Sequence, residues 1–369
     1  MNLKRLHEAG VSIWLDTLSR RLLQSGEFAG LIRDDSVTGA TSNPTIFAKA
    51  ITGSDRYDEQ LRRLAAAGGR ETRELFFALA LEDVREAARE MRRVYEQSGG
   101  RDGFISFECT PDLADDTQAT IDQASELWRR LGQPNVMIKV PGTEAGLAAI
   151  EELTRRGVNV NVTLLFSIER YERVIGAYLR GLAARADAGE PLTGISSVAS
   201  FFLSRIDTKV DATLPEDSPL RGRVAIASAR VAYQSFLAKF AGGEWERLQA
   251  LGGKRQRPLW ASTGTKNPDY SDVRYVAELI GPDVINTMPE QTLRAFADHG
   301  EVTRTLDGDP TQAESTLAEV AGAGIDLGAV TAELELEGVG SFCASYRQLL
   351  DCIEGKLGTL ARTGHGGRV

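Results

Sequence analysis

Residues 136–140, Val-Met-Ile-Lys-Val, are the part of the sequence that indicates the fold most directly. Its β-branched and apolar residues predict a strand, and a Pro-Gly turn follows it directly. Alternate residues of a strand face opposite sides, so Lys139 shares a face with Met137, while Ile138 and Val140 form the other face. The sheet must therefore be of a kind that accommodates a lysine on one face, at the end of an apolar strand.

Seven other segments resemble strands, and longer segments of helical periodicity separate most of them. The eight predicted strands are 12–16, 37–43, 104–108, 136–140, 158–165, 194–200, 259–262 and 283–287. Helices are predicted over 70–98, 117–131, 144–156, 167–187, 220–241 and 269–280. Eight strands that alternate with helices predict an α/β protein of the (β/α)8 TIM-barrel class.

The inner face of the predicted barrel follows from the alternation along each strand. Apolar residues occupy one side, which is expected to pack under the helices, and the opposite side lines the interior. By this rule Asp16, Glu108, Lys139 and Thr163 all point inward. Each also lies at the C-terminal end of its strand, which is the end where barrel enzymes build their active sites.

The whole chain, 1–369, is expected to form one barrel domain, because no linker, repeat or change of composition divides it. Residues 301–369 are expected to be a helical C-terminal extension that packs on the barrel, with helices over 310–363. The tail that begins with Gly364 and His365 is expected to be mobile.

Composition excludes several classes of protein. The net charge is −9 and no long basic run occurs, so nucleic acid is not an expected partner. No apolar run is long enough to span a membrane, and the charged first ten residues lack the apolar core of a secretory signal. Three cysteines argue against a disulfide framework and favour the cytoplasm. Three scattered histidines give no metal-site spacing, and no nucleotide-binding glycine motif occurs, so neither metal nor cofactor is expected.

The inward lysine and carboxylates indicate covalent catalysis. A buried amine that has lost its proton attacks a carbonyl, and the resulting imine accepts the electrons of a breaking C–C bond. One carboxylate then moves the proton of the adjacent hydroxyl, and another group manages water. Lys139, Asp16 and Glu108 supply these groups. Two alternatives remain open from the residues alone: a structural ion-pair network, and a lysine that extends from the strand end into solvent.

Four motifs in barrel order resemble those of the transaldolase family. They are Ile13-Trp14-Leu15-Asp16-Thr17, Gly39-Ala40-Thr41-Ser42-Asn43-Pro44-Thr45-Ile46-Phe47, Ile138-Lys139-Val140-Pro141-Gly142-Thr143 and Asn161-Val162-Thr163-Leu164-Leu165-Phe166-Ser167. Matches extend over roughly residues 10–300 and at least six of the eight strands, and several motifs in order are far more specific than one.

The resemblance implies a role for each residue. Lys139 would form the Schiff base, and Asp16 would exchange the proton of the substrate C4 hydroxyl. Glu108 and Thr163 would hold the catalytic water. Asn43 would bind a hydroxyl of the three-carbon unit, although an Asn-Pro pair is also a common entry to a helix.

The resemblance also implies a phosphate site, and here the chain departs from the better-known members of the family. Ser200 and Arg205 match the sixth-strand region, where the family's arginine holds the substrate phosphate, and Ser262 ends the seventh strand. Those members carry an arginine soon after this serine, whereas this chain offers Lys266. Both Arg205 and Lys266 could instead be ordinary surface residues.

The implied activity is that of a transferase of the pentose phosphate pathway. It moves a dihydroxyacetone unit from sedoheptulose 7-phosphate to glyceraldehyde 3-phosphate, which gives erythrose 4-phosphate and fructose 6-phosphate. Sugar phosphates are thus the expected partners, and the chain is expected to be a monomer or a homodimer. A fructose-6-phosphate aldolase-like enzyme and a non-catalytic sugar-phosphate-binding barrel are the alternatives. The insert at 54–98 and the C-terminal helices favour the transferase, because the aldolases are much shorter.

Overall fold

A computed structural model describes residues 1–69, 71–306 and 308–365 of the chain. Eight parallel strands follow one another in order around a closed barrel, and β1 pairs with β8 to complete it. The predicted TIM barrel is therefore confirmed. The strands are β1 (Val11–Leu15), β2 (Val37–Thr41), β3 (Phe104–Glu108), β4 (Val136–Pro141), β5 (Val160–Leu165), β6 (Ser197–Phe202), β7 (Arg257–Ala261) and β8 (Val284–Met288).

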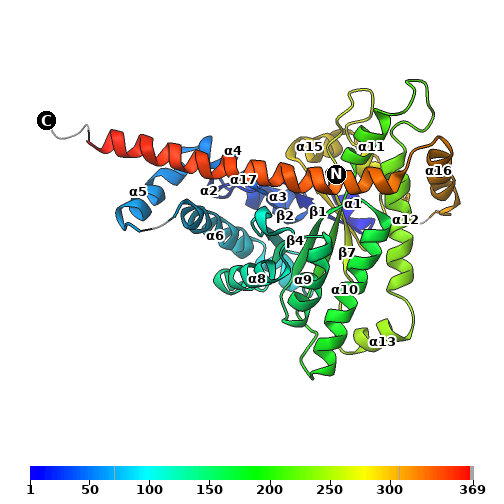
Figure 1. The fold of residues 1–369 in the computed structure, drawn as a ribbon, viewed down its shortest axis with the longest axis horizontal. Coiled ribbons are helices and arrows are strands. Elements are labelled where there is room, and N and C mark those ends of the chain that lie inside the picture. Colours follow the sequence, from blue (N-terminus) through cyan, green and yellow to red (C-terminus); the bar gives the residue numbers. More distant parts are fainter. Residues whose placement is uncertain (70, 307, 366–369) are drawn as a thin grey trace.

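Helices connect the strands and surround the barrel (Figure 1). Before β3 the structure has α1 (Asn2–Glu8), α2 (Arg20–Gln24), α3 (Glu27–Asp34), α4 (Pro44–Thr52), η1 (Asp55–Tyr57), α5 (Asp58–Ala66), α6 (Thr72–Glu90) and α7 (Arg92–Gln97). Between β3 and β7 it has η2 (Pro111–Leu113), α8 (Thr117–Leu131), α9 (Glu144–Arg155), α10 (Ile168–Asp187), α11 (Ser204–Asp211), α12 (Val224–Lys239) and α13 (Gly243–Ala250). The last helices are α14 (Arg274–Ala277), α15 (Glu290–His299), α16 (Thr311–Gly322) and α17 (Leu327–His365).

The strand register confirms the predicted alternation. Glu108 pairs with Lys139, and Lys139 pairs with Asn161, so these three side chains share the interior at one level. Further from the C-terminal ends of the strands, Trp14 of β1 lies against Gly39 of β2. This packing leaves the polar side chains together near the C-terminal ends of the strands, as expected for a barrel with its site at that end.

Two segments differ from the expectation. The predicted helix 269–280 forms only the single turn α14, because Asn267 and Pro268 begin a turn and the loop is held by tertiary contacts: Thr265 donates a hydrogen bond to the carbonyl of Ser271. The predicted helix 70–98 is interrupted at Met91, where α6 ends and α7 begins.

The long helix α17 crosses the end of the barrel where the strands finish (Figure 1). It contacts segments that follow β2, β5 and β6. Thr45 of α4 donates a hydrogen bond to Ser345 at 2.8 Å, Arg170 of α10 pairs with Glu335 at 3.4 Å, and Lys209 of α11 pairs with Glu337 at 2.7 Å. The helix thus covers one side of the barrel mouth. The expected mobile tail falls mainly on residues 366–369, which lie outside the described residues.

Candidate active site

Lys139 is buried inside the barrel mouth, with 5% of its surface exposed. Its Nζ donates a hydrogen bond to the carbonyl of Ser42 at 3.2 Å and lies 3.4 Å from Oε1 of Glu108. The sequence-based alternative of a lysine that extends into solvent is therefore wrong. A buried amine can form an imine with a carbonyl substrate, and the neighbouring carboxyl group can exchange the protons of that reaction.

Glu108 is also buried, and its surroundings favour the protonated acid. Burial raises the pKa of its carboxyl above the ordinary value, against the opposing effect of Lys139. Apart from the ion pair of Oε1 with Lys139, neither carboxylate oxygen has a hydrogen-bond partner among the described residues, and Oγ1 of Thr163, which is 1% exposed, has none. Buried polar atoms normally satisfy each other or a water molecule. Both residues therefore have hydrogen-bonding capacity to offer a substrate or a water inside the barrel.

Asp16 lies one residue beyond β1, not at the strand's last position as predicted, and its backbone N–H donates to the carbonyl of Met288 at 2.7 Å. Its Oδ1 accepts a hydrogen bond of 2.7 Å from Oγ1 of Thr41, and Thr41 in turn contacts Oγ1 of Thr287 at 2.8 Å. Burial raises the pKa of Asp16, whereas Lys139, the Thr41 hydrogen bond and Lys266 act to lower it. A carboxylate with a raised pKa is a stronger base once ionised.

A chain of hydrogen bonds lies on the strand faces beside Lys139. Ser200 donates to Oδ1 of Asn161 at 2.7 Å, and Nδ2 of Asn161 donates to Oγ of Ser106 at 2.9 Å. The prediction that Ser200 ends the sixth strand is wrong, because β6 continues to Phe202. Ser200 therefore lies deeper than expected, and its hydroxyl orients Asn161.

Asn43 is the N-cap residue of helix α4. Its Oδ1 accepts a hydrogen bond of 3.0 Å from the backbone N–H of Ile46, with Pro44 in the first turn. The local capping role is thus present. Asn43 directly follows Ser42, whose carbonyl accepts a hydrogen bond from Nζ of Lys139. Asn43 is therefore adjacent in sequence to a residue that contacts the lysine.

The candidate phosphate residues come from two segments that are fastened together. The prediction that Ser262 ends the seventh strand is wrong, because β7 ends at Ala261 and Ser262 follows it. Ser262 has a φ of +55°, which a serine rarely adopts, and its Oγ lies 2.9 Å from that of Ser204 at the start of α11. Arg205 is the next residue of α11, and its guanidinium lies over the ring of Phe202. Burial lowers the pKa of Arg205, whereas Glu337 of α17 raises it.

Lys266 lies in the exposed loop after β7. This loop is attached to α11 by two hydrogen bonds from tyrosines to carboxylates: Tyr270 donates to Asp211 at 2.7 Å, and Tyr275 donates to Asp207 at 2.8 Å. Lys266 is also near enough to Asp16 to favour its ionised form. The structure therefore places Lys266 at the same mouth of the barrel as the inward residues.

Three features of the site carry no prediction from the sequence: Thr41, Asn161 and the Tyr270–Asp211 contact. Thr41 and Asn161 could have been found, because both belong to the quoted motifs and both lie on the inward parity of their strands. The tyrosine contact gives no such signal, since 59 residues separate its partners.

Comparison with known proteins decides the family. A model of the Transaldolase/Fructose-6-phosphate aldolase family matches residues 13–353. The chain belongs to this family. A protein named transaldolase from Saccharopolyspora erythraea is 48% identical over 96% of this chain and 98% of its own length. A transaldolase of Mycolicibacterium smegmatis is 47% identical over 96% and 97%, and transaldolase 1 of Streptomyces coelicolor is 48% identical over 95% and 93%.

Proposed function

We propose that this chain is a transaldolase, a transferase that passes a dihydroxyacetone unit between sugar phosphates through a lysine Schiff base. The observation that carries the proposal is the buried Lys139, 3.4 Å from Glu108, in a barrel mouth that also holds Asp16. The relatives support the same activity, since proteins named transaldolase match this chain over nearly their whole length.

The reaction begins when Nζ of Lys139 attacks the C2 carbonyl of sedoheptulose 7-phosphate. The carbinolamine loses water to give the imine, and Glu108 with Thr163 exchanges the protons and holds that water. Asp16 then takes the proton of the C4 hydroxyl. The C3–C4 bond breaks, its electron pair enters the imine to form an enamine, and erythrose 4-phosphate departs.

The second half reverses these steps with a new acceptor. The enamine attacks the aldehyde carbon of glyceraldehyde 3-phosphate, and Asp16 returns its proton to the new alkoxide. Water then adds to the imine, and fructose 6-phosphate leaves with Lys139 restored. Asn43 and Ser200 are proposed to bind and orient the three-carbon unit and its surroundings, and Arg205, Ser262 and Lys266 to contact the phosphate.

The aldolase alternative differs only in the fate of the enamine, which would be protonated and released as free dihydroxyacetone. The deciding experiment measures fructose 6-phosphate formed from sedoheptulose 7-phosphate in the presence and absence of glyceraldehyde 3-phosphate. Acceptor-dependent transfer is expected. Release of free dihydroxyacetone at the same rate without acceptor would identify an aldolase, and no turnover in either assay would leave a binding barrel.

Two features of the chain bear on its compartment. None of the described helices is both long and apolar enough to cross a membrane. Cys109, Cys343 and Cys352 are all unpaired. Free thiols suit a reducing compartment, and we propose the cytoplasm.

A further inference from the structure

A second cavity lies at the opposite end of the barrel from Lys139. It has a volume of about 470 Å³. Its walls come from residues that stand just before strands: Arg101 before β3, Ser196 before β6, Lys254 before β7 and Asp283 before β8. In a barrel this end normally serves stability, and the reaction proposed above uses none of these residues.

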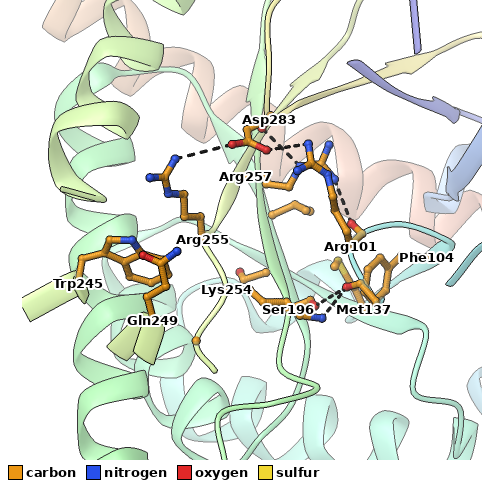
Figure 2. A pocket seen from close by; sticks show the side chains of 14 residues that line it. Arg101, Phe104, Met137, Ser196, Trp245, Gln249, Lys254, Arg255, Arg257 and Asp283 are labelled. Carbon is orange, nitrogen blue, oxygen red and sulfur yellow. Dashed lines mark hydrogen bonds and ion pairs between the residues drawn. The ribbon is translucent and has the colours of Figure 1, made fainter. Parts of the chain in front are cut away.

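The cavity is strongly cationic although the chain carries a net charge of −9. Arg101, Lys254, Arg255 and Arg257 line it, together with a single carboxylate, that of Asp283. Asp283 pairs with Arg101 at 2.7 Å and approaches Arg255 at 3.7 Å. Figure 2 shows these contacts along one side of the cavity, with Trp245 and Gln249 on one flank and Arg101 and Phe104 on the other.

Arg257 is a buried cation without a carboxylate partner. It is 7% exposed, and no ion pair joins it to any described residue. Its Nη2 donates to Ser12 at 2.5 Å and to the carbonyl of Val284 at 3.0 Å, and its Nη1 donates to the carbonyl of Arg101 at 3.0 Å. Burial lowers its pKa to about 10, so it remains charged at neutral pH. Its hydrogen-bond acceptors are all neutral oxygens, and the carboxylates of Asp102 and Asp283 favour its charged form without pairing with it. An anion in the cavity would stabilise this buried charge further.

Lys254 repeats the pattern. Its Nζ donates to the carbonyls of Gly99 and Gly100, at 3.2 Å and 2.7 Å, and it has no ion pair with the described residues. An ammonium group has three donors, so one remains for a ligand. Burial lowers the pKa of Lys254 as well. Two partly desolvated cations therefore border one cavity, with donors that no carboxylate occupies.

The wall beside these cations also carries an aromatic ring and an amide. Trp245 of α13 lines the cavity and is 4% exposed, but its Nε1 is buried away from the cavity surface, so it contributes ring surface. Gln249, one turn further along α13, adds an exposed amide. Phe104 and Met137 supply apolar surface. Cationic and amide donors beside apolar surface suit a ligand that combines a multiply charged acceptor group with a small organic part.

We propose that this cavity binds a compound with a phosphate or pyrophosphate group, as a site separate from the one at Lys139. Phosphate offers several charged acceptor oxygens, which match the guanidinium and ammonium donors. Lys254 and Arg255 contact the group directly, and Arg257 supplies the fixed charge beneath it. The lining residues lie before the strands and not after them, so a ligand in this cavity would be held apart from the sugar at Lys139.

The test measures the binding of inorganic pyrophosphate by isothermal titration calorimetry. Because pyrophosphate also competes for the proposed phosphate contact in the barrel mouth, the measurement is made in Arg205→Ala protein. Saturable binding is expected there in the millimolar range or tighter. The double change Lys254→Gln and Arg255→Gln should weaken it more than about tenfold, since each charge-assisted hydrogen bond is worth roughly that factor.

The matched control is Arg247→Gln. Arg247 lies on the same helix as Trp245, but it pairs with Asp187 at 3.1 Å and does not line the cavity. It should leave the affinity unchanged. Transfer activity measured in the otherwise wild-type chain should survive the Lys254 and Arg255 changes, which shows that the variant is folded. Absence of saturable binding in Arg205→Ala protein, or equal affinity in the double variant, would overturn the proposal.

Discussion

Nζ of Lys139 and Oε1 of Glu108 lie 3.4 Å apart on adjacent strands, directly paired in register. Burial raises the pKa of the Glu108 carboxyl and so favours its protonated form. The charge of Lys139 acts in the opposite direction. A protonated acid beside an attacking amine can donate the proton that carries away the hydroxyl of a carbinolamine as water.

The first prediction is that Lys139 carries the covalent intermediate. Borohydride reduction in the presence of fructose 6-phosphate should inactivate the chain and leave a reduced sugar adduct on the peptide that contains Lys139. Lys139→Ala should give neither adduct nor turnover. Lys239→Ala is the matched control, since this exposed lysine of α12 pairs with Glu172 outside the proposed site and should leave the labelling intact. Label on a different peptide would refute the assignment.

The second prediction separates the two acids. Asp16→Ala should still form the reducible imine but should lose cleavage of the C3–C4 bond by about 100-fold or more, because it removes only the proton transfer. Glu108→Ala should instead slow the formation and hydrolysis of the imine. Rapid-quench measurement of imine and of released erythrose 4-phosphate distinguishes the steps. The roles are reversed if Glu108→Ala accumulates imine without cleavage.

The third prediction concerns pH and Thr41. Burial raises the pKa of Asp16, and the hydrogen bond from Thr41 opposes that rise by favouring the ionised carboxylate. The base must be ionised to act, so kcat/KM should fall as the pH drops through the pKa of Asp16. Thr41→Val removes the hydrogen bond and raises this pKa further, which should move the acidic limb of the profile to higher pH.

Thr38→Val is the control for this experiment, because Thr38 lies on the same strand and its hydroxyl donates to the carbonyl of Ile13, away from Asp16. Its pH profile should match that of the unchanged chain. If both variants shift the acidic limb equally, the shift reports general disturbance of β2 and not the state of Asp16.

The sequence predicts the strands well because each has apolar residues on one side and a turn after it. The same alternation places Lys139, Glu108 and Thr163 inside the barrel. It is less informative about strand ends, where Ser200 proves to be internal and Asp16 lies one residue outside. Helix 269–280 fails because contacts such as Tyr270 with Asp211 outweigh local periodicity. The cationic cavity cannot be predicted from the sequence, because its lining residues come from segments that are far apart in the chain.

The fourth prediction tests the packing that supports the site. A Cβ atom at Gly39 would lie 2.5 Å from Nε1 of Trp14, which donates to Asp102 at 2.8 Å in the barrel interior. Gly39→Ala should therefore reduce the free energy of unfolding by about 1–3 kcal/mol, as overpacking does. Gly340→Ala, where nothing lies within 4 Å, should be neutral or stabilise α17. Denaturant unfolding of both variants decides, and equal stability would show that Trp14 moves freely.

The fifth prediction addresses the phosphate, where this chain differs from the better-known family members. Arg205 presents a planar fork at the start of α11, and Lys266 presents a point charge on a loop that Tyr270 and Asp211 fasten to the same helix. Arg205→Ala should raise KM for fructose 6-phosphate by about tenfold or more, since hydrogen bonds to charged groups carry this energy, and should hardly change the use of fructose.

Lys266→Ala should have a smaller effect of the same kind, and Lys266→Arg should be tolerated, because a point charge imposes little geometry. The same lysine lowers the pKa of Asp16, so Lys266→Ala should also move the acidic limb of kcat/KM to higher pH, for phosphorylated and unphosphorylated donors alike. The ratio of kcat/KM for the two donors isolates the phosphate contact from this electrostatic effect. If Lys266→Ala shifts the pH profile but leaves that ratio unchanged, Lys266 acts on Asp16 alone and Arg205 binds the phosphate with a different partner.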